Sequence, residues 1–277
     1  MSARKRALPV GWYPSSGEEC NFEMDAFLKG FNPPQGLWRG GVVPHAGWYF
    51  SGRAAARVIS TIAASTQPDR VVIYGGHLTS GHPIIYTDSE WETPLGTLTL
   101  DSSFAEELVS ARDAVRAGRS FSDNTVEIQL PMIQRFFPGV PVIAVHSPAS
   151  DGALLLGTAV QALLNELGLS AVYIGSADLT HYGPNYGFVP KGSGASAVQW
   201  VKEENDRSLI DKALAMEAQA IIQDARLKHN TCSAGPIASV VTSVLRHGVK
   251  KGNLLEYYTS YDVMPNASFV GYAAILY

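Results

Sequence analysis

The sequence is low in charge, low in cysteine and free of long apolar runs. Charged residues make up 17% of its 277 residues, and the interspersed acids and bases leave a formal net charge of -4. Because phosphate binding needs concentrated Lys and Arg, this distribution argues against a nucleic-acid partner. No segment approaches the roughly 20 consecutive apolar residues of a membrane-spanning helix. We therefore expect a soluble protein with neither a nucleic-acid nor a membrane partner.

The placement of cysteine and proline bears on the compartment. The two cysteines, Cys20 and Cys232, lie far apart, and a chain of this size needs no disulfide framework, which favours a reducing environment. The basic residues at positions 4–6 resemble the start of a signal peptide, but the prolines, glycine and polar residues at positions 9–20 interrupt any apolar core. We expect a cytoplasmic protein. Because no repeat or linker divides the chain, we expect one domain over residues 1–277.

Short apolar runs alternate with longer segments of helical character. The expected strands are residues 41–43, 70–74, 140–145, 171–174, 255–261 and 269–277, and the expected helices are 52–64, 102–114, 153–167, 196–227 and 234–246. The first four strands are nearly continuously apolar, as strands buried on both faces are. The pattern predicts an α/β fold, a three-layer α/β/α sandwich around a mixed, largely parallel sheet whose last two strands pair antiparallel.

Histidine and aspartate side chains follow three of the expected strands. His45 lies in a Pro-His-Ala-Gly turn, His77 follows two glycines, and Asp178 and His181 share a glycine-bounded turn after Ile174. A lone histidine after a strand is more often structural than a ligand, but the glycine turns set His45 and His77 apart. Ligands of open α/β sheets bind beyond the carboxyl ends of the strands, so these side chains predict one pocket.

A third ligand can come from either of two places. Cys232 precedes the expected helix 234–246, where backbone N–H groups stabilise a thiolate, although a small buried hydrophobe is the commoner fate of a free cysteine. Asp178 and His181, three residues apart, suit a pair in which one group ligates or orients and the other moves protons. Two histidines with a third anionic ligand are typical of mononuclear non-haem iron, and zinc or copper also accept such ligands. The residues alone leave Cys232 and Asp178 as alternatives.

Two further segments carry expectations of their own. Asp123 or Asn124 is expected to cap a short helix, with Glu127 closing a capping box. The Gly- and Ser-rich residues 186–200 are a candidate lid. His146 is assigned a structural or supporting role, and His229, at the end of a helix, is assigned none.

The ordered set of motifs resembles a known family. The matching stretches are residues 44–47 with 49–52, 76–77, 126–131, 176–183, 231–232, 260–261 and 269–273. In this order they resemble the Memo family (mediator of receptor-driven cell motility), whose bacterial members are called AmmeMemoRadiSam system protein B. The family usually carries an acidic residue, His and Ser before Val-Glu-x-Gln-Leu-Pro, where this chain has Asp123, Asn124 and Thr125. Asn124 cannot exchange protons as histidine can.

The resemblance implies the fold of LigB-type class III extradiol dioxygenases. It implies that His45, His77 and Cys232 are the metal ligands, with Cys232 where the dioxygenases carry a glutamate. His181 matches the acid/base histidine of the dioxygenases, and Asp178 lies beside it. Candidates for binding substrate or supporting the ligands are Asn124, Glu127, Tyr182 and Tyr49.

The leading hypothesis is an oxygen-dependent, dioxygenase-like enzyme. Fe(II) is the expected metal, with copper or zinc as alternatives, and the expected substrate is a small, catechol-like aromatic molecule. His181 is expected to take and return protons. The alternatives are a non-catalytic metal- or peptide-binding protein that keeps the dioxygenase pocket, and a copper or iron redox protein.

Overall fold

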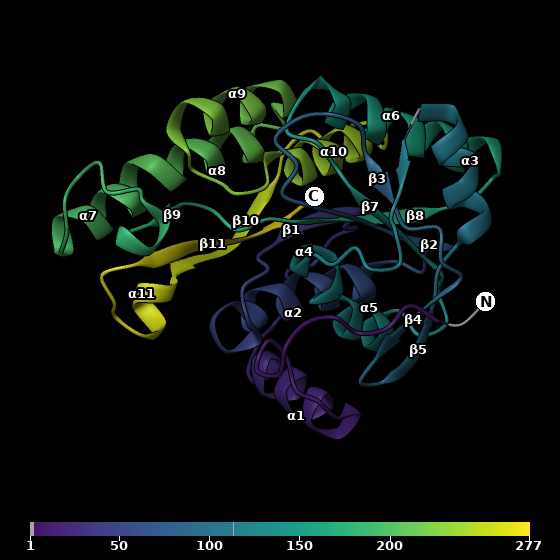
Figure 1. The fold of residues 1–277 in the computed structure, drawn as a ribbon, viewed down its shortest axis with the longest axis horizontal. Helices are drawn as coiled ribbons and strands as arrows, with labels where there is room; N and C mark the ends of the chain where they lie inside the picture. Colours follow the sequence, from purple (N-terminus) through teal and green to yellow (C-terminus); the bar gives the residue numbers. More distant parts are fainter. Residues whose placement is uncertain (1–2, 113) are drawn as a thin grey trace.

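The computed structural model describes residues 3–112 and 114–277 and is built on one large sheet (Figure 1). Its strand order is β10-β11-β1-β8-β2-β7-β3-β6, and β9 pairs with β11. The four central strands are β1 (Gly40–Val43), β8 (Ala171–Ser176), β2 (Arg70–Gly75) and β7 (Val142–His146). All four are buried along nearly their whole length, which explains their continuous apolar sequences.

The central strands run parallel, so their carboxyl ends meet at one edge. Val43 of β1 pairs with Ser176 of β8, Tyr74 of β2 pairs with Gly175, and Gly75 pairs with His146 of β7. The loops that follow β1, β2 and β8 therefore leave the sheet side by side. This register brings residues that are distant in sequence to one place.

Antiparallel strands complete the sheet on both sides. β11 (Phe269–Leu276) pairs antiparallel with β1 and with β10 (Asn253–Thr259), and β9 (His181–Tyr182) also pairs with β11. On the other side β3 (Ile84–Ile85) runs antiparallel to β7 and parallel to β6 (Val115–Arg116). The expected mixed, largely parallel sheet is confirmed.

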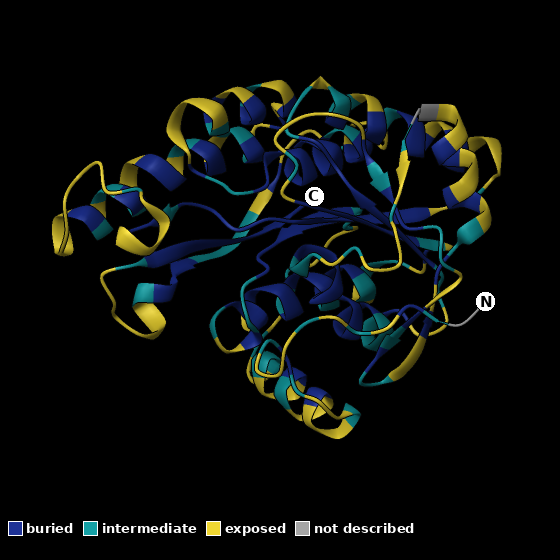
Figure 2. Ribbon diagram, viewed as in Figure 1, coloured by how far each residue is buried: buried dark blue, intermediate teal, exposed yellow. Residues whose placement is uncertain are grey.

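Helices cover both faces of the sheet (Figure 1). One face carries α1 (Gly17–Leu28), α2 (Trp48–Ser65), α4 (Asn124–Glu127) and α5 (Leu130–Phe136). The other carries α3 (Ser102–Arg112), α6 (Asp151–Glu166), α8 (Asp206–Leu214), α9 (Ala218–Lys228) and α10 (Ala234–Leu245). Two hydrophobic clusters fill the layers, and the central strands between them are buried in Figure 2. The α/β/α sandwich is confirmed.

The expected helix 196–227 is wrong as a single helix. The chain forms α7 (Ala195–Trp200), a π-helical turn η2 (Val201–Asn205), α8 and α9. The break before α9 contains Met216 with a φ of 64°. Apolar residues continue at helical spacing across this break, so the pattern alone does not show where the axis changes.

Several elements were not expected from the sequence. Helix α1 has only Cys20 and Met24 buried, so its apolar period is weak, and it begins with a capping box between Ser16 and Glu19. β4 (Glu90–Thr93) and β5 (Gly96–Thr99) form a separate hairpin. Shorter elements are η1 (Pro184–Tyr186) and α11 (Ser260–Val263). The expected helix 102–114 is α3, and its residue 113 lies outside the described residues.

A helix that crosses a bilayer needs roughly 20 predominantly apolar residues. Across residues 3–112 and 114–277, none of the helices combines the length and the apolar character needed to cross a membrane.

Candidate metal centre

Three side chains from distant parts of the chain meet at the carboxyl edge of the sheet. His45 follows β1, His77 follows β2, and Cys232 lies just before α10. Their ligand atoms lie within 4.8 Å of one another, and no other such group of His, Cys, Asp and Glu occurs among residues 3–112 and 114–277. His45 Nε2 is 3.2 Å from Cys232 Sγ, and the two imidazole rings are 5.1 Å apart at 85°. The expected ligands are therefore brought together.

The surroundings of the two imidazoles fit a metal ion. Asp123 Oδ2 is 2.9 Å from His77 Nδ1, and Ser176 Oγ is 3.4 Å from His45 Nδ1. These contacts leave Nε2 of each ring as the available ligand atom, and a hydrogen bond at the other ring nitrogen is usual for metal-bound histidine. Metal–nitrogen and metal–sulfur bonds place neighbouring ligand atoms roughly 3–4.5 Å apart. The three ligand atoms lie within 4.8 Å of one another, so they need to move only slightly closer together to reach this spacing.

Charge in the cluster also favours a cation. Burial raises the pKa of the Cys232 thiol, but His45, His181 and His77 outweigh burial and hold that pKa well below its usual value. The hydrogen bond to Asp123, followed by the Cys232 thiolate, raises the pKa of His77 to about 10. The cluster thus combines a soft thiolate with imidazoles whose pKa values are raised, and a bound metal ion would supply the positive charge in place of protons.

Asp178 ties together the segments that carry the ligands. Its Oδ1 accepts a hydrogen bond from the backbone N–H of His45 (2.7 Å). Its backbone carbonyl accepts from Thr231 Oγ1 (2.6 Å) and from the backbone N–H of Cys232 (3.3 Å). Asp178 is outside the three-residue group, so the geometry favours Cys232 as the third ligand and leaves Asp178 to hold the segments in place.

His181 is the imidazole of the site whose Nε2 makes no hydrogen bond with the described residues. Its Nε2 is 3.7 Å from Asp178 Oδ2, beyond hydrogen-bond length, and this buried atom has no hydrogen-bond partner among the described residues. Burial lowers the pKa of His181, but Asp178 and Cys232 outweigh burial and raise it to about 10. A buried, unsatisfied ring nitrogen is costly, so this atom indicates a place for a ligand group.

A cavity of about 440 Å³ opens over these groups; we call it the metal-site cavity. Its lining includes His45, His77, Asn124, Asp178, His181, Trp12, Phe50, Tyr186 and Tyr272. The candidate ligands His45 and His77 and the side chains of Asp178 and His181 therefore face one space with aromatic walls. Such a space suits a small planar molecule.

Asn124 and Glu127 have different places. Asn124 lines the metal-site cavity and donates its amide to the backbone carbonyl of His45 (3.0 Å). The Glu127 carboxylate instead accepts hydrogen bonds from the backbone of Ala7 (3.0 Å) and from Tyr13 Oη (2.9 Å). The expected capping box is wrong, because Glu127 holds the N-terminal segment while Asp123 alone caps α4 through the backbone N–H of Thr125.

The two tyrosine candidates lie away from the ligands. Tyr182 is buried, donates its hydroxyl to the carbonyl of Gly192 (2.9 Å) and packs in a small cluster with Phe269. Tyr49 is exposed and lines a separate cavity with Trp48 and Phe22. Neither is among the lining residues of the metal-site cavity.

Sequence reasoning missed two supports of the ligands. Asp123 was expected only as a helix cap, yet it also bonds the His77 ring. Gln129 donates its amide to the carbonyl of Pro44 (2.7 Å), next to His45, and lies 3.3 Å from Ser176 Oγ. The sequence contains one signal for this role, because Gln129 is a polar residue within the mostly apolar segment 126–133.

The turn that carries Asp178 and His181 is held by a buried carboxylate. Asp206 Oδ1 accepts hydrogen bonds from the backbone N–H of Thr180 (3.0 Å) and from its hydroxyl, and Oδ2 accepts from Tyr257 Oη (2.7 Å). Burial raises the pKa of Asp206 to about 6, against the lowering effect of these hydrogen bonds.

This shift predicts a pH-dependent stability. Because the folded pKa exceeds the unfolded value of 3.8, Asp206 stabilises the fold most below that value, and this contribution is lost as pH rises through about 6. We expect wild-type stability relative to Asp206→Asn to fall by on the order of 2–3 kcal/mol between about pH 4 and about pH 7. Denaturant unfolding at stepped pH measures the difference. A difference that does not change with pH contradicts the prediction.

Comparison with known proteins identifies a family and a shared fold. A family model described as Memo-like protein matches residues 4–276. A MEMO1 family protein of Thermococcus onnurineus is 31% identical over 99% of both chains, and one of Methanosarcina acetivorans is 31% identical over 100% of this chain and 99% of its own. A solved structure of an uncharacterized protein from Escherichia coli K12 has a TM-score of 0.51 at 11% identity, covering 79% of this chain and 91% of that one, which shows a shared fold alone. The chain belongs to the Memo-like protein family.

Proposed function

We propose that this protein is an oxygen-dependent oxidoreductase with a mononuclear Fe(II) site that acts on a small, catechol-like aromatic substrate. One observation carries the proposal. His45 and His77 of the candidate metal centre and the Asp178–His181 pair line the same aromatic-walled cavity. The metal centre alone would suit a metal-binding protein, but a half-buried imidazole that lines the same space suits proton transfer.

Each group of the site has a separate role in the proposed reaction. Fe(II), when bound by His45, His77 and Cys232, supplies a site for the substrate hydroxyls and for the reaction with oxygen. His181 Nε2 has no hydrogen-bond partner among the described residues, so it can exchange a proton with a substrate hydroxyl. Asp178, 3.7 Å away, stabilises the protonated imidazole. The aromatic walls exclude water and hold the ring of the substrate.

The thiolate favours a second candidate. Cys232 is a softer ligand than a carboxylate and also suits copper and zinc. A copper or iron redox protein, or a metal- or peptide-binding protein without turnover, would keep the metal cluster but would need no unpaired acid/base histidine. His181 is therefore the residue on which the candidates differ.

Oxygen uptake by the Fe(II)-loaded protein with a panel of catechols tests the proposal. We expect uptake with at least one catechol, and we expect His181→Gln to lower it about 100-fold or more, because general acid/base groups contribute on that scale. Fe(II) content should stay unchanged in this variant, since His181 is outside the ligand group.

His247→Gln is the matched control. His247 lies beside Tyr173, with its Nε2 3.3 Å from the tyrosine hydroxyl, and is not among the residues lining the metal-site cavity. This variant should retain full uptake. The absence of uptake with every catechol would favour the non-catalytic or redox candidates, and full activity in His181→Gln would remove the proton-transfer role.

A further inference from the structure

Three neighbouring cavities extend from the metal centre. Beside the metal-site cavity lies a second one of about 450 Å³, here the Cys232 cavity, whose lining includes Cys232, Thr231 and Gly187. His181 and Tyr186 line both cavities, and their rings are 4.8 Å apart. The metal centre is therefore reached from two sides, with this ring pair between them.

The Cys232 cavity continues into a third space of about 320 Å³, here the Trp200 pocket. Phe188 and His229 line both, with their rings 5.8 Å apart in an edge-to-face arrangement. Tyr186 and Phe188, which form the two boundaries, belong to one short segment after the Asp178–His181 turn. A molecule lying over the Phe188–His229 pair would extend from the metal centre into the Trp200 pocket.

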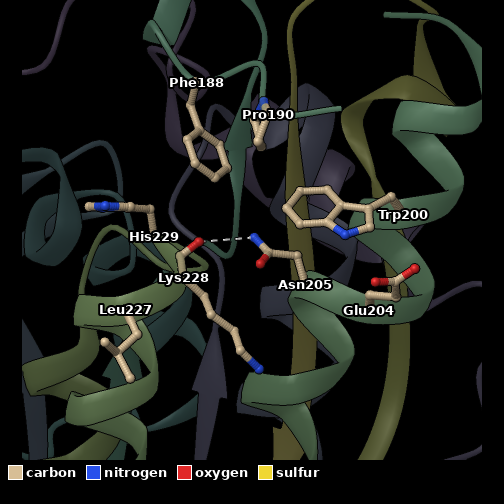
Figure 3. A pocket seen from close by; sticks show the side chains of 8 residues that line it. All are labelled: Phe188, Pro190, Trp200, Glu204, Asn205, Leu227, Lys228 and His229. Carbon is tan, nitrogen blue, oxygen red and sulfur yellow. Dashed lines mark hydrogen bonds between the residues drawn. The ribbon is translucent and has the colours of Figure 1, made fainter. Parts of the chain in front are cut away.

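The walls of the Trp200 pocket favour an aromatic ring. Figure 3 shows Phe188 above the space and Trp200 beside it, with Leu227 and Lys228 below. The Phe188 and Trp200 rings are 6.4 Å apart at 47°, so a third ring can pack against both without separating them.

The polar groups of the pocket disfavour an anionic ligand. The Lys228 ammonium pairs with Asp224 at 3.2 Å, and the Lys191 ammonium lies 5.7 Å from the centre of the Trp200 ring. The buried Asn205 amide nitrogen donates to Thr180 Oγ1 (2.9 Å) and to the carbonyl of Lys228 (3.3 Å), the contact drawn in Figure 3. Its amide oxygen is the acceptor that this arrangement leaves for a ligand. Among the described residues that line the pocket, the Lys228 ammonium already has a carboxylate partner, and the exposed Glu204 adds a negative charge to the lining, so an anionic tail is disfavoured.

We propose that the substrate is an extended molecule whose catechol-like head binds at the metal centre and whose uncharged, ring-bearing tail lies in the Trp200 pocket. The head rests on the function proposed above. The tail rests on the shared lining of the Cys232 cavity and the Trp200 pocket and on the chemistry of the Phe188 and Trp200 walls.

Two matched ligands test the tail. Anaerobic equilibrium binding to the Fe(II)-loaded protein compares 4-propylcatechol with 4-(3-phenylpropyl)catechol, which differ by the terminal ring. We expect the ring to lower Kd about 10-fold, as packing against two aromatic walls can. Trp200→Ala should remove this gain and leave the Kd of 4-propylcatechol unchanged.

A second variant tests the same pocket in case Trp200→Ala does not fold. Leu227 lines the pocket but is 79% exposed near the end of α9, so Leu227→Lys keeps the fold and replaces an apolar wall with a charge. Leu227→Lys should also reduce the gain in affinity that the terminal ring of the ligand provides. Tyr49→Ala, which removes an exposed aromatic side chain outside all three cavities, should retain the full gain.

The outcomes separate this inference from the proposed function. Equal Kd values for the two ligands, an unchanged gain in Trp200→Ala and Leu227→Lys, or the absence of binding by either ligand would each overturn the tail site. A Trp200-dependent gain without oxygen uptake would support the tail site and contradict the proposed oxidoreductase.

Discussion

Replacing Cys232 by serine is expected to raise the Kd for Fe(II) more than 100-fold, and His77→Ala should do the same. Each substitution removes one of three ligand atoms that lie within 4.8 Å of one another. Loss of a group that only supports a ligand costs roughly 10- to 100-fold in metal affinity, so loss of a ligand should cost more. Anaerobic titration and the metal content after desalting measure the effect, and the wild-type chain should hold about one Fe(II).

Cys20→Ala is the control for the loss of a thiol. Cys20 is buried in α1, with its thiol 3.5 Å from the carbonyl of Pro14, and it takes no part in the ligand group. This variant should bind Fe(II) as the wild type does. Full Fe(II) binding by Cys232→Ser would instead make Asp178 the third ligand, the alternative that the sequence left open.

Gly235→Ala is expected to lower the free energy of unfolding by about 3 kcal/mol, at the upper end of the usual cost of overpacking. A Cβ at this position would lie 2.4 Å from the carbonyl oxygen of Ser147 and 2.6 Å from that of Pro148. Both atoms belong to the backbone after β7, so relief requires moving the start of α10 away from the sheet. Chemical denaturation followed by far-ultraviolet circular dichroism measures the loss.

The matched substitution is Gly118→Ala. A Cβ on Gly118 meets no atom within 4 Å, and its φ lies outside the left-handed range. Its stability should stay within about 0.5 kcal/mol of the wild type. A loss of similar size in both variants would show that the contact between α10 and the loop after β7 does not limit stability.

The parts of the fold that follow from short-range patterns were predictable. β2 and β8 are continuous apolar runs because they are buried on both faces, and the sequence places both within two residues of their observed ends. His45 and His77 could be found because each stands directly after such a strand. Parallel neighbours then bring the two loops together.

The parts that depend on tertiary contacts were not predictable. Glu127 stands where a capping residue is expected. Its carboxylate instead accepts hydrogen bonds from the backbone N–H of Ala7 and the hydroxyl of Tyr13, which belong to the N-terminal segment. Cys232 could not be preferred to Asp178 from the residues alone, because the choice depends on how the segment before α10 lies against the end of β8. The break at Met216 depends on packing that the apolar period does not record.

The position of β11 bears on how the protein is made. Residues 269–276 form an interior strand between β10 and β1, although every other strand of the sheet precedes them in the sequence. A nascent chain therefore exposes the open edge of β1 until this last strand has left the ribosome, and an open edge invites pairing with other chains. Cys232 also emerges late, so the complete ligand set exists only on a nearly finished polypeptide. A metal ion that needs all three of these side chains would therefore bind after translation and could not guide it.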